Sequence, residues 1–195
     1  MKYTSIRKNK TTRKKGNTMN VMLDLETMGT SPNAPIVAIG AVKFSLEDLT
    51  IDMEDTFYRQ IYLPDIVDMG AQICPYTVLW WLKQDKAAIE QTFLQNDPDE
   101  GAYGPLCDFA AWLPEKAKVW GNGSDFDNVL LAETYKRIGE KVPWRFFNNR
   151  CYRTVKKLYP QVELKREGTH HNALSDAISQ AKHLIEIWRS NEKST

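Results

Sequence analysis

The stretch Pro35–Phe44 (PIVAIGAVKF) constrains the fold most, because its side chains are almost continuously apolar. Its many β-branched residues predict a buried β-strand. The shorter apolar run Asn20–Asp24 predicts a central strand before it, and the alternating segment Asp55–Leu63 predicts a third strand after it. Three strands in succession indicate an antiparallel meander.

The rest of the chain has the pattern of helices with two further strands. Lys118–Gly121 predicts a fourth strand and Phe146–Phe147 a fifth. Helices are predicted over Tyr76–Lys83, Lys86–Leu94, Leu106–Leu113, Phe126–Ile138, Cys151–Leu158 and Asn172–Trp188. The last is the clearest, since its apolar side chains share one broad face, and Ser124 or Asp125 could cap the helix that starts at Phe126. This order predicts an α/β fold with a five-stranded mixed sheet, three antiparallel strands plus two parallel ones, flanked by helices.

A single domain is the economical arrangement, because neither a repeat nor an internal linker interrupts the chain. We assign it to residues 19–190, followed by a C-terminal tail at 191–195. No apolar run approaches the roughly 18 residues of a membrane helix. The three cysteines are widely spaced and lack C-x-x-C pairing, which suits reduced thiols. A cytoplasmic protein without a membrane partner is therefore expected.

Residues 1–18 differ from the rest of the chain in charge. They carry seven Lys or Arg side chains and no acidic one, so the net charge of +1 for the whole chain leaves −6 for the remainder. An untranslated or poorly ordered leader is one interpretation, because Met19 directly precedes the first apolar strand. A tail that attracts phosphate groups, and does so less at high salt, is the other.

Acidic side chains occur at three places where a strand or helix could direct them to one point. Asp24 and Glu26 stand two residues apart on the first strand, so alternation places both on one side of it. Asp127 lies in the first turn of a helix, where the helix dipole favours an anion, and His171 and Asp176 straddle the start of the last helix. Gathered carboxylates repel one another unless divalent cations lie between them, and Mg²⁺ and Mn²⁺ prefer oxygen ligands. The pattern predicts a metal-dependent phosphodiesterase.

Three short motifs carry a resemblance to a known family. Asp24-x-Glu26-Thr27, Asn122-Gly123-x-x-Phe126-Asp127 and His171-x4-Asp176 resemble, in this order, the motifs of the ribonuclease T-like DEDDh class of 3′→5′ exonucleases. The segment Gly121–Asp127 (GNGSDFD), together with Thr77-x-x-Trp80-Trp81 and Met28-Gly29, is most similar to the bacteriophage exonuclease A-type branch. The resemblance spans roughly Met19–Trp188.

The resemblance implies a ribonuclease H-like fold and a two-metal in-line displacement. The ligands of two Mg²⁺ or Mn²⁺ ions would be Asp24, Glu26, Asp127 and Asp176. One metal would position the attacking water and the other would stabilise the leaving 3′-oxygen, so that a nucleoside 5′-monophosphate is released. His171 would be the general base, a role that suits a histidine because it titrates near neutral pH.

Two neighbouring residues compete with these assignments. The x4 spacing to Asp176 selects His171 over His170, and the preceding Phe126 selects Asp127 over Asp125. All five positions of the motif set are filled, which disfavours an inactive descendant.

A groove for a strand end needs side chains that stack on bases and bind phosphates. Adjacent tryptophans on one helix cannot both face inward, so one of Trp80 and Trp81 belongs to the core and the other to the groove or a dimer contact. In the family, residues at the place of Met28 pack against the terminal base. The expected substrate contacts are Thr27, Met28, Trp81, Asn122 and Arg153. The basic residues Arg150, Arg153, Lys156 and Lys157, with Lys165 and Arg166, form either a phosphate-binding or a solvated surface.

The predicted activity is that of a 3′→5′ exonuclease on single-stranded nucleic-acid ends in a bacterial or phage-infected cell. The bacteriophage-like motifs favour DNA slightly over RNA, a choice that depends on contacts to the 2′-hydroxyl. The alternatives are an exoribonuclease of the same family, a noncatalytic nucleic-acid-binding module and a proofreading accessory protein. Because ribonuclease T-like relatives often pair, a homodimer is expected.

Overall fold

The computed structural model describes residues 19–94, 98–99, 101–168 and 171–192 of the 195-residue chain. The expected leader at residues 1–18 and the competing His170 lie outside the described residues. The strands are β1 (Asn20–Thr27), β2 (Ile36–Ser45), β3 (Thr50–Gln60), β4 (Lys118–Gly121) and β5 (Asn149–Cys151). The helices are α1 (Leu63–Asp68), α2 (Pro75–Trp81), α3 (Lys86–Phe93), α4 (Tyr103–Trp112), α5 (Asp127–Arg137), α6 (Tyr152–Leu158) and α7 (Ala173–Glu192).

The strands form one mixed sheet in the order β3-β2-β1-β4-β5. β1, β2 and β3 pair antiparallel, whereas β4 lies parallel to β1 and β5 lies parallel to β4. The prediction of three antiparallel strands plus two parallel ones is confirmed. β1 is central because its apolar side chains are buried on both faces of the sheet.

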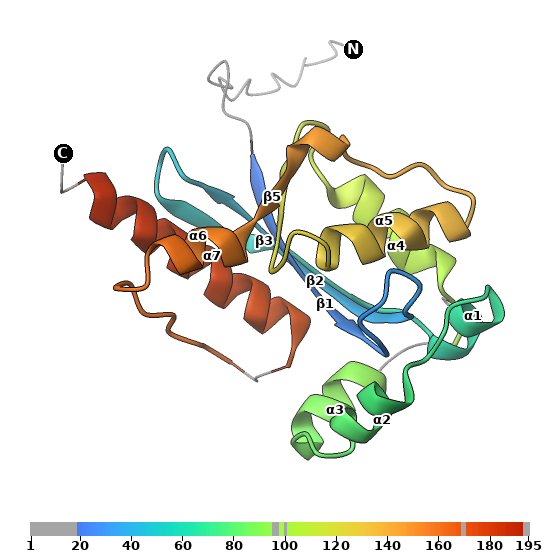
Figure 1. Cartoon of the computed structure of the whole chain (residues 1–195). Helices are drawn as coiled ribbons and strands as arrows, with labels where there is room; N and C mark the ends of the chain where they lie inside the picture. Colours follow the sequence, from blue (N-terminus) through green and yellow to red (C-terminus); the bar gives the residue numbers. More distant parts are fainter. Residues whose placement is uncertain (1–18, 95–97, 100, 169–170, 193–195) are drawn as a thin grey trace, which may run out of the picture.

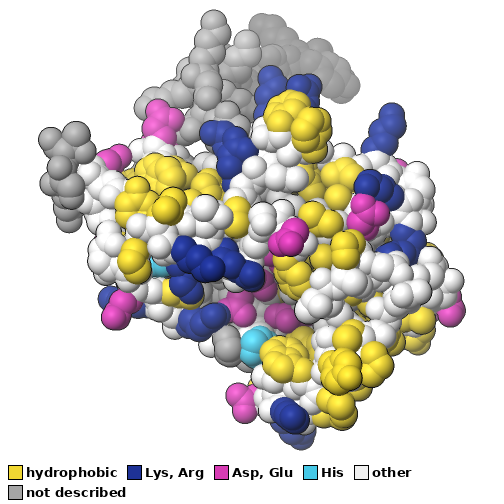
Figure 2. Space-filling view, viewed as in Figure 1, with side chains coloured by type: hydrophobic (Ala, Val, Ile, Leu, Met, Phe, Trp, Pro, Cys, Tyr) yellow, Lys and Arg dark blue, Asp and Glu magenta, His cyan; other side chains and the backbone are white. Residues whose placement is uncertain are grey.

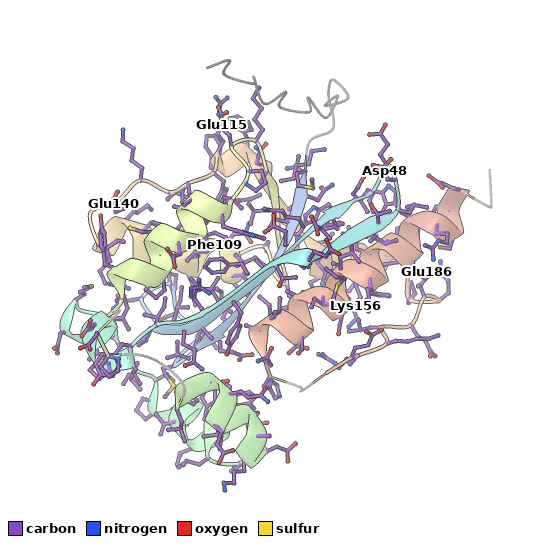
Figure 3. The ribbon with its side chains drawn as sticks, turned by 180° about the vertical axis from the view of Figure 1, so that it is seen from behind. Asp48, Phe109, Glu115, Glu140, Lys156 and Glu186 are labelled. Atoms are coloured by element: carbon purple, nitrogen blue, oxygen red, sulfur yellow. The ribbon has the colours of Figure 1, made fainter. Side chains whose placement is uncertain are left out.

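Helices cover both faces of the sheet (Figure 1), with α4 and α5 on one face and α6 and α7 on the other. Alternation along β1 sends Leu23 into the core under α4 and α5, and Met22 into the core under α7. Phe109 of α4 points toward the sheet (Figure 3) and meets Phe57 of β3 edge-on, with ring centroids 5.2 Å apart. No helix in the described part of the chain is long and apolar enough to cross a membrane.

A third, smaller core lies at the end of β1, where α2 and α3 close the molecule (Figure 1). Met28, Val37 and Trp81 are buried in it. The Nε1–H of Trp81 donates to the Thr27 carbonyl at 3.0 Å, which ties α2 to the end of β1.

Close contact between α7 and β2 depends on a glycine. A Cβ atom placed on Gly40 would lie 2.1 Å from the Ala173 carbonyl carbon and 2.2 Å from the Leu174 nitrogen. Gly40 is the partner of Asp24 in the β1–β2 register. The first turn of α7 therefore lies directly over the middle of β2, next to Asp24 of β1, because position 40 has no side chain.

Several predicted boundaries were wrong. The third strand starts at Thr50 rather than Asp55 and ends at Gln60, and Leu63 begins α1, which the sequence did not indicate. β3 is an edge strand, and its mostly exposed first half alternates polar and apolar residues (TIDME), a pattern that the expected start at Asp55 left out. α7 continues to Glu192, two residues into the expected tail.

The fifth strand and one helix cap also differ from expectation. Phe146 and Phe147 form a 3₁₀ turn with exposed side chains, and the strand follows at Asn149–Cys151, where pairing with β4 places it. α5 begins at Asp127 with Phe126 at the N-cap position and no side-chain cap. Ser124 and Asp125 lie too early in the chain to cap it, since Val129 and Leu130 both donate to the Phe126 carbonyl.

Candidate active site

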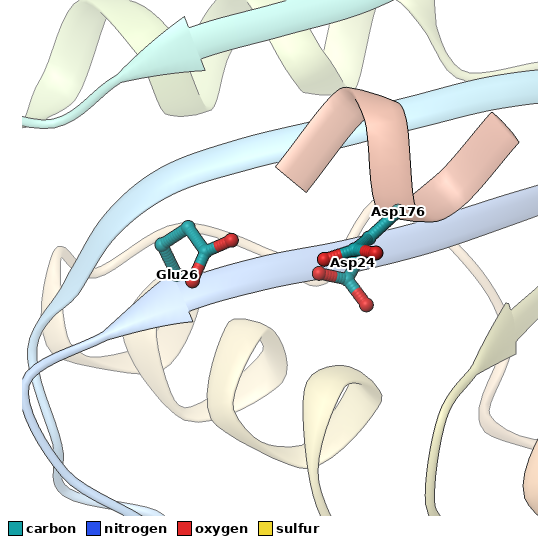
Figure 4. A group of neighbouring side chains, drawn as sticks. All are labelled: Asp24, Glu26 and Asp176. Atoms are coloured by element: carbon teal, nitrogen blue, oxygen red, sulfur yellow. The ribbon is translucent and has the colours of Figure 1, made fainter. Parts of the chain in front are cut away.

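Asp24 and Glu26 come from β1 and face the side of the sheet that α7 covers. They share this face with Met22, because alternate residues of a strand point the same way. Asp24 is partly buried and Glu26 is buried. In Figure 4, Asp176 reaches from α7 toward Asp24, and Glu26 lies farther along the same strand.

The start of α7 positions both Asp176 and His171. The Asn172 side chain caps the helix by accepting from the Ser175 N–H at 3.0 Å, and the Asp176 N–H donates to the Asn172 carbonyl. His171 adopts a left-handed backbone with φ of 62°, which is uncommon for a residue other than glycine. In this conformation its N–H donates to Oδ2 of Asp176 at 3.2 Å. The motif histidine and aspartate are thus linked through the backbone.

Three of the four predicted carboxylates converge closely. One oxygen from each of Asp24, Glu26 and Asp176 lies within 4.8 Å of the other two. Asp127 stands outside this group in the same pocket, and its Oδ2 accepts from the Asn122 N–H at 2.6 Å. The second motif therefore works as a unit, because the Asn122 backbone holds the Asp127 carboxylate in place.

Three of the four carboxylates have raised pKa values. Burial, followed by repulsion from Asp127, Glu26 and Asp176, holds the pKa of Asp24 well above its usual value, against a hydrogen bond from Gln180. Burial and repulsion from Asp176 and Asp127 raise the pKa of Glu26 to about 8. Burial raises the pKa of Asp127 to about 6, although the Asn122 N–H opposes this shift. Negative charge is thus held in this site at a cost in free energy.

The acidic group lies in a pocket of about 640 Å³. Arg153 and Arg166 line it together with the carboxylates, and so do Tyr76 and Trp80 of α2. Figure 2 shows acidic side chains gathered in the middle of this face, with Lys and Arg side chains on one side and hydrophobic side chains on the other. Such a pocket offers cationic contacts for phosphates and aromatic faces for bases.

His171 lines the same pocket, beside the two tryptophans of α2. Its ring meets Trp80 edge-on with centroids 4.8 Å apart, and Trp81 at 6.2 Å. Its carbonyl accepts from the Thr92 hydroxyl at 3.4 Å, which links it to α3. The candidate base therefore lies beside the tryptophans of α2 through its ring and on Asp176 through its backbone N–H.

The predicted substrate residues are distributed unevenly. Thr27, Trp81, Asn122 and Arg153 line the pocket. Trp81 is only 4% exposed, however, and Trp80 is 41% exposed, so Trp80 is the tryptophan that presents a face to solvent. Met28 is buried against Val37 and Trp81 and does not line the pocket, which separates it from a base bound there.

Sequence reasoning missed Gln180. Its Nε2 donates to Oδ1 of Asp24 at 2.7 Å, and its Oε1 is buried without a hydrogen-bond partner. The signal was present, because Gln180 lies one helical turn after Asp176 on the same face of α7. The basic residues fall into two groups. Arg153 and Arg166 line the pocket, whereas Arg150, Lys156 and Lys157 do not.

The donor set fits hard divalent cations. Asp24, Glu26 and Asp176 offer only oxygen atoms, at a spacing that one ion can bridge, and the raised pKa values of Asp24 and Glu26 indicate that nearby positive charge would be stabilising. Mg²⁺ and Mn²⁺ are suited to such carboxylate sites.

The stability of the metal-free protein should fall as the pH rises from about 4.5 to about 8. The unfolded chain ionises Glu26 near pH 4.5, whereas the folded chain keeps the proton to about pH 8, so the unfolded state releases protons first. We expect a loss of roughly 2 to 4 kcal/mol over this window, or about 5 to 10 °C in Tm. Thermal melts in chelator at each pH measure it.

The matched variants are Glu26→Gln, which should flatten this pH dependence, and Glu115→Gln at an exposed position, which should not. Saturating Mn²⁺ should restore the stability of the wild type at pH 8. Equal pH dependence in the wild type and Glu26→Gln would show that the acidic group is not the source.

Comparisons with known proteins identify a family for this chain and solved structures with a similar fold. The family model of the 3′-5′ exoribonuclease Rv2179c-like domain matches residues 19–188. A search of curated proteins found no match. Among solved structures, the nuclease domain of 3′hExo, a DEDDh family member bound to rAMP, superposes with a TM-score of 0.57 at 15% identity, covering 91% of this chain and 95% of that one.

Two further structures are similar over nearly the whole chain. E. coli Exonuclease I in complex with a 5cy-dT13 oligonucleotide gives a TM-score of 0.62 at 12% identity, covering 91% of this chain and 42% of that one. Cell-death related nuclease 4 gives 0.54 at 12% identity, covering 89% of this chain and 64% of that one. The chain therefore spans less than two thirds of these two proteins. The ribonuclease H-like fold is confirmed.

Proposed function

Because the chain belongs to the family of 3′-5′ exoribonuclease Rv2179c-like domains and is a 3′→5′ exonuclease, we propose that it removes nucleoside 5′-monophosphates from single-stranded nucleic-acid ends. The observation that carries the proposal is the convergence of Asp24, Glu26 and Asp176 within 4.8 Å in an open pocket. Exonuclease I, which has the same fold, is known in complex with a single-stranded oligonucleotide.

Two divalent cations, Mg²⁺ or Mn²⁺, are the proposed cofactors, held by Asp24, Glu26, Asp127 and Asp176. When bound, such ions supply an activated water and neutralise charge that develops on the phosphate and the leaving 3′-oxygen. Gln180 orients the Asp24 carboxylate, and the Asn122 N–H orients that of Asp127. The protein thus presets the positions of its acidic oxygens.

The remaining pocket residues bind and orient the strand end. His171 takes the proton from the attacking water, since it lines the same pocket as the carboxylates and an ordinary histidine titrates near working pH. Arg153 and Arg166 contact phosphate oxygens. The scissile phosphate is thereby held between these two arginines and the carboxylates, and the bases of the bound strand lie toward α2.

Two observations point to different sugars. We place this chain in the bacteriophage exonuclease A-type branch because of its motifs, and this placement favours DNA. The description of the matching family favours RNA, and we keep an exoribonuclease as the second candidate. A contact to the 2′-hydroxyl decides between them.

The test is a time course on matched 5′-labelled DNA and RNA, single- and double-stranded, with Mg²⁺ or Mn²⁺. A product ladder that shortens from the 3′ end is expected, and the faster of the two single-stranded substrates identifies the sugar. No nucleotide release with either metal would overturn the proposal in favour of a noncatalytic binding module.

We also propose the domain bounds and the oligomeric state of the protein. Residues 19–190 form one exonuclease domain, and two copies of the chain form a homodimer, as ribonuclease T-like relatives often do. Light scattering that gives the mass of a single chain would contradict the dimer.

The two tryptophans of α2 should respond differently to truncation. Trp80→Ala removes an exposed aromatic face beside His171, so we expect substrate affinity to fall by about tenfold with little change in stability. Trp81→Ala empties a buried site and should cost about 3 to 5 kcal/mol of stability. Oligonucleotide binding by anisotropy and urea denaturation measure the two effects.

Leu82→Ala is the control, because Leu82 is 72% exposed on the same segment and does not line the pocket. If Trp80→Ala binds the oligonucleotide as tightly as the wild type does, the proposed stacking contact is wrong.

A further inference from the structure

We propose that Arg166 is an internal counterion of the metal site, which neutralises Asp176 in the metal-free enzyme and is displaced when a divalent cation binds. The inference rests on the proposed function and adds a competitor for the metal. It also assigns Arg166 a second position, on the substrate phosphate, once the metal has replaced it at Asp176.

The two oxygens of Asp176 are both engaged. Oδ1 accepts from Nη1 of Arg166 at 2.5 Å, and Oδ2 accepts from the His171 N–H at 3.2 Å. Asp176 also belongs to the group of three carboxylates that converge within 4.8 Å. A carboxylate that binds a metal must direct an oxygen at it. Each oxygen keeps a second lone pair, but a divalent cation on Oδ1 would lie beside the positively charged guanidinium and repel it.

The bond to Arg166 is the one that can be released. The His171 N–H is fixed by the start of α7, where Asn172 caps the helix and accepts from Asp176. The Arg166 side chain is 48% exposed, whereas that of Asp176 is 11% exposed. Solvent can therefore take up the guanidinium at small cost, while the carboxylate has no comparable alternative.

The backbone around Arg166 is anchored, so only its side chain needs to move. The Glu167 N–H donates to the Ser179 hydroxyl at 3.0 Å, and the Glu167 carboxylate pairs with Lys182. Upstream, the Val162 carbonyl contacts Nε2 of buried His183 at 2.8 Å. The segment from Val162 to Glu167 thus stays on α7 when the metal displaces the Arg166 side chain, and Arg166 continues to line the pocket.

An arginine held there by its backbone is placed for a second partner. Arg166 lines the pocket with Arg153, and the guanidinium group is suited to bidentate contact with phosphate. Metal binding to the carboxylates would therefore also free the Arg166 guanidinium to bind phosphate. Removing Arg166 should have opposite effects on the two ligands, tightening metal binding and weakening oligonucleotide binding.

The test is calorimetric titration of Mn²⁺ into chelator-treated wild type, Arg166→Gln, Arg166→Lys and Lys165→Gln, at one pH and ionic strength. Arg166→Gln should bind Mn²⁺ about three to ten times more tightly than the wild type, because the metal no longer displaces an ion pair. Lys165→Gln removes a neighbouring exposed charge and should match the wild type, as should Arg166→Lys, which keeps the cation.

Thermal melts separate this role from a purely structural one. In chelator, the Tm of Arg166→Gln should be lower than that of the wild type. In saturating Mn²⁺ the two Tm values should be equal, because the wild type has then also lost the ion pair. A deficit that persists in Mn²⁺, or unchanged Mn²⁺ affinity, would overturn the inference. Absence of Mn²⁺ binding by the wild type would instead overturn the proposed function.

Discussion

Asp24→Asn is expected to lower nucleotide release by roughly a thousandfold or more while the protein remains folded. Asp24 is the electrostatic centre of the site, because the other three carboxylates, Asp127, Glu26 and Asp176, all raise its pKa. Asparagine keeps the shape of the side chain and removes the charge that a cation would neutralise. Initial rates on a labelled single strand with Mg²⁺ measure the loss.

The same substitution should stabilise the metal-free protein. Replacing Asp24 relieves repulsion among buried carboxylates, so Tm in chelator should rise by an amount equivalent to about 1 to 2 kcal/mol. Lower activity together with higher stability would exclude misfolding as the cause. Asp125→Asn, at the exposed position beside Asp127, is the matched control and should retain activity.

His171→Asn provides the contrast within the site. It should also reduce the rate strongly, but should leave Mn²⁺ affinity close to that of the wild type, because we assign His171 to proton transfer rather than metal binding. Full activity in Asp24→Asn would contradict the metal-dependent mechanism, and full activity in His171→Asn would contradict the general base.

Gly40→Ala is expected to destabilise the protein by about 3 kcal/mol or more, because the added methyl group meets backbone. The Cβ atom would lie within 2.5 Å of three backbone atoms of Ala173 and Leu174, and a helix backbone cannot move aside as a flexible side chain can. α7 would have to shift away from β2, carrying Asp176 away from Asp24. Urea denaturation and Mn²⁺ titration measure the two consequences.

Gly139→Ala is the control for the general effect of replacing a glycine. An added Cβ there meets no atom within 4 Å, although the φ of 77° makes alanine strained, so a cost of about 1 kcal/mol and unchanged metal binding are expected. Wild-type stability in Gly40→Ala would mean that the helix does not need this close approach.

The expected site residues were chosen from three short motifs, each made of residues that are close together in the sequence. Asp24 and Glu26 follow from strand alternation, and Asp176 from its place in the first turn of a strongly amphipathic helix. β4 matched its predicted bounds, and the sheet has the predicted pairing pattern. Periodicity over residues near in sequence is enough to find such strands and helices, whereas the choice of the site residues on them used the family resemblance.

Other features depended on contacts between distant segments. β5 has three residues and no periodicity of its own, so its position is set by pairing with β4. The assignment of Trp81 as the substrate tryptophan used the motif alone, whereas its burial follows from the hydrogen bond to Thr27 and packing on Met28. Gln180 gains its role only when α7 lies across β1.

The sequence by itself determined which chemical groups this protein brings to its site: four carboxylates, a histidine and flanking cations on identifiable strands and helices. Only the tertiary structure decided how these groups meet. Close packing of α7 over Gly40 brings Asp176 to Asp24 and Glu26, and separate contacts hold Asp127 on the Asn122 N–H and Arg166 on Asp176. The reason is that local periodicity fixes the direction of a side chain along its own element, whereas distances between elements follow from how closely their backbones can pack.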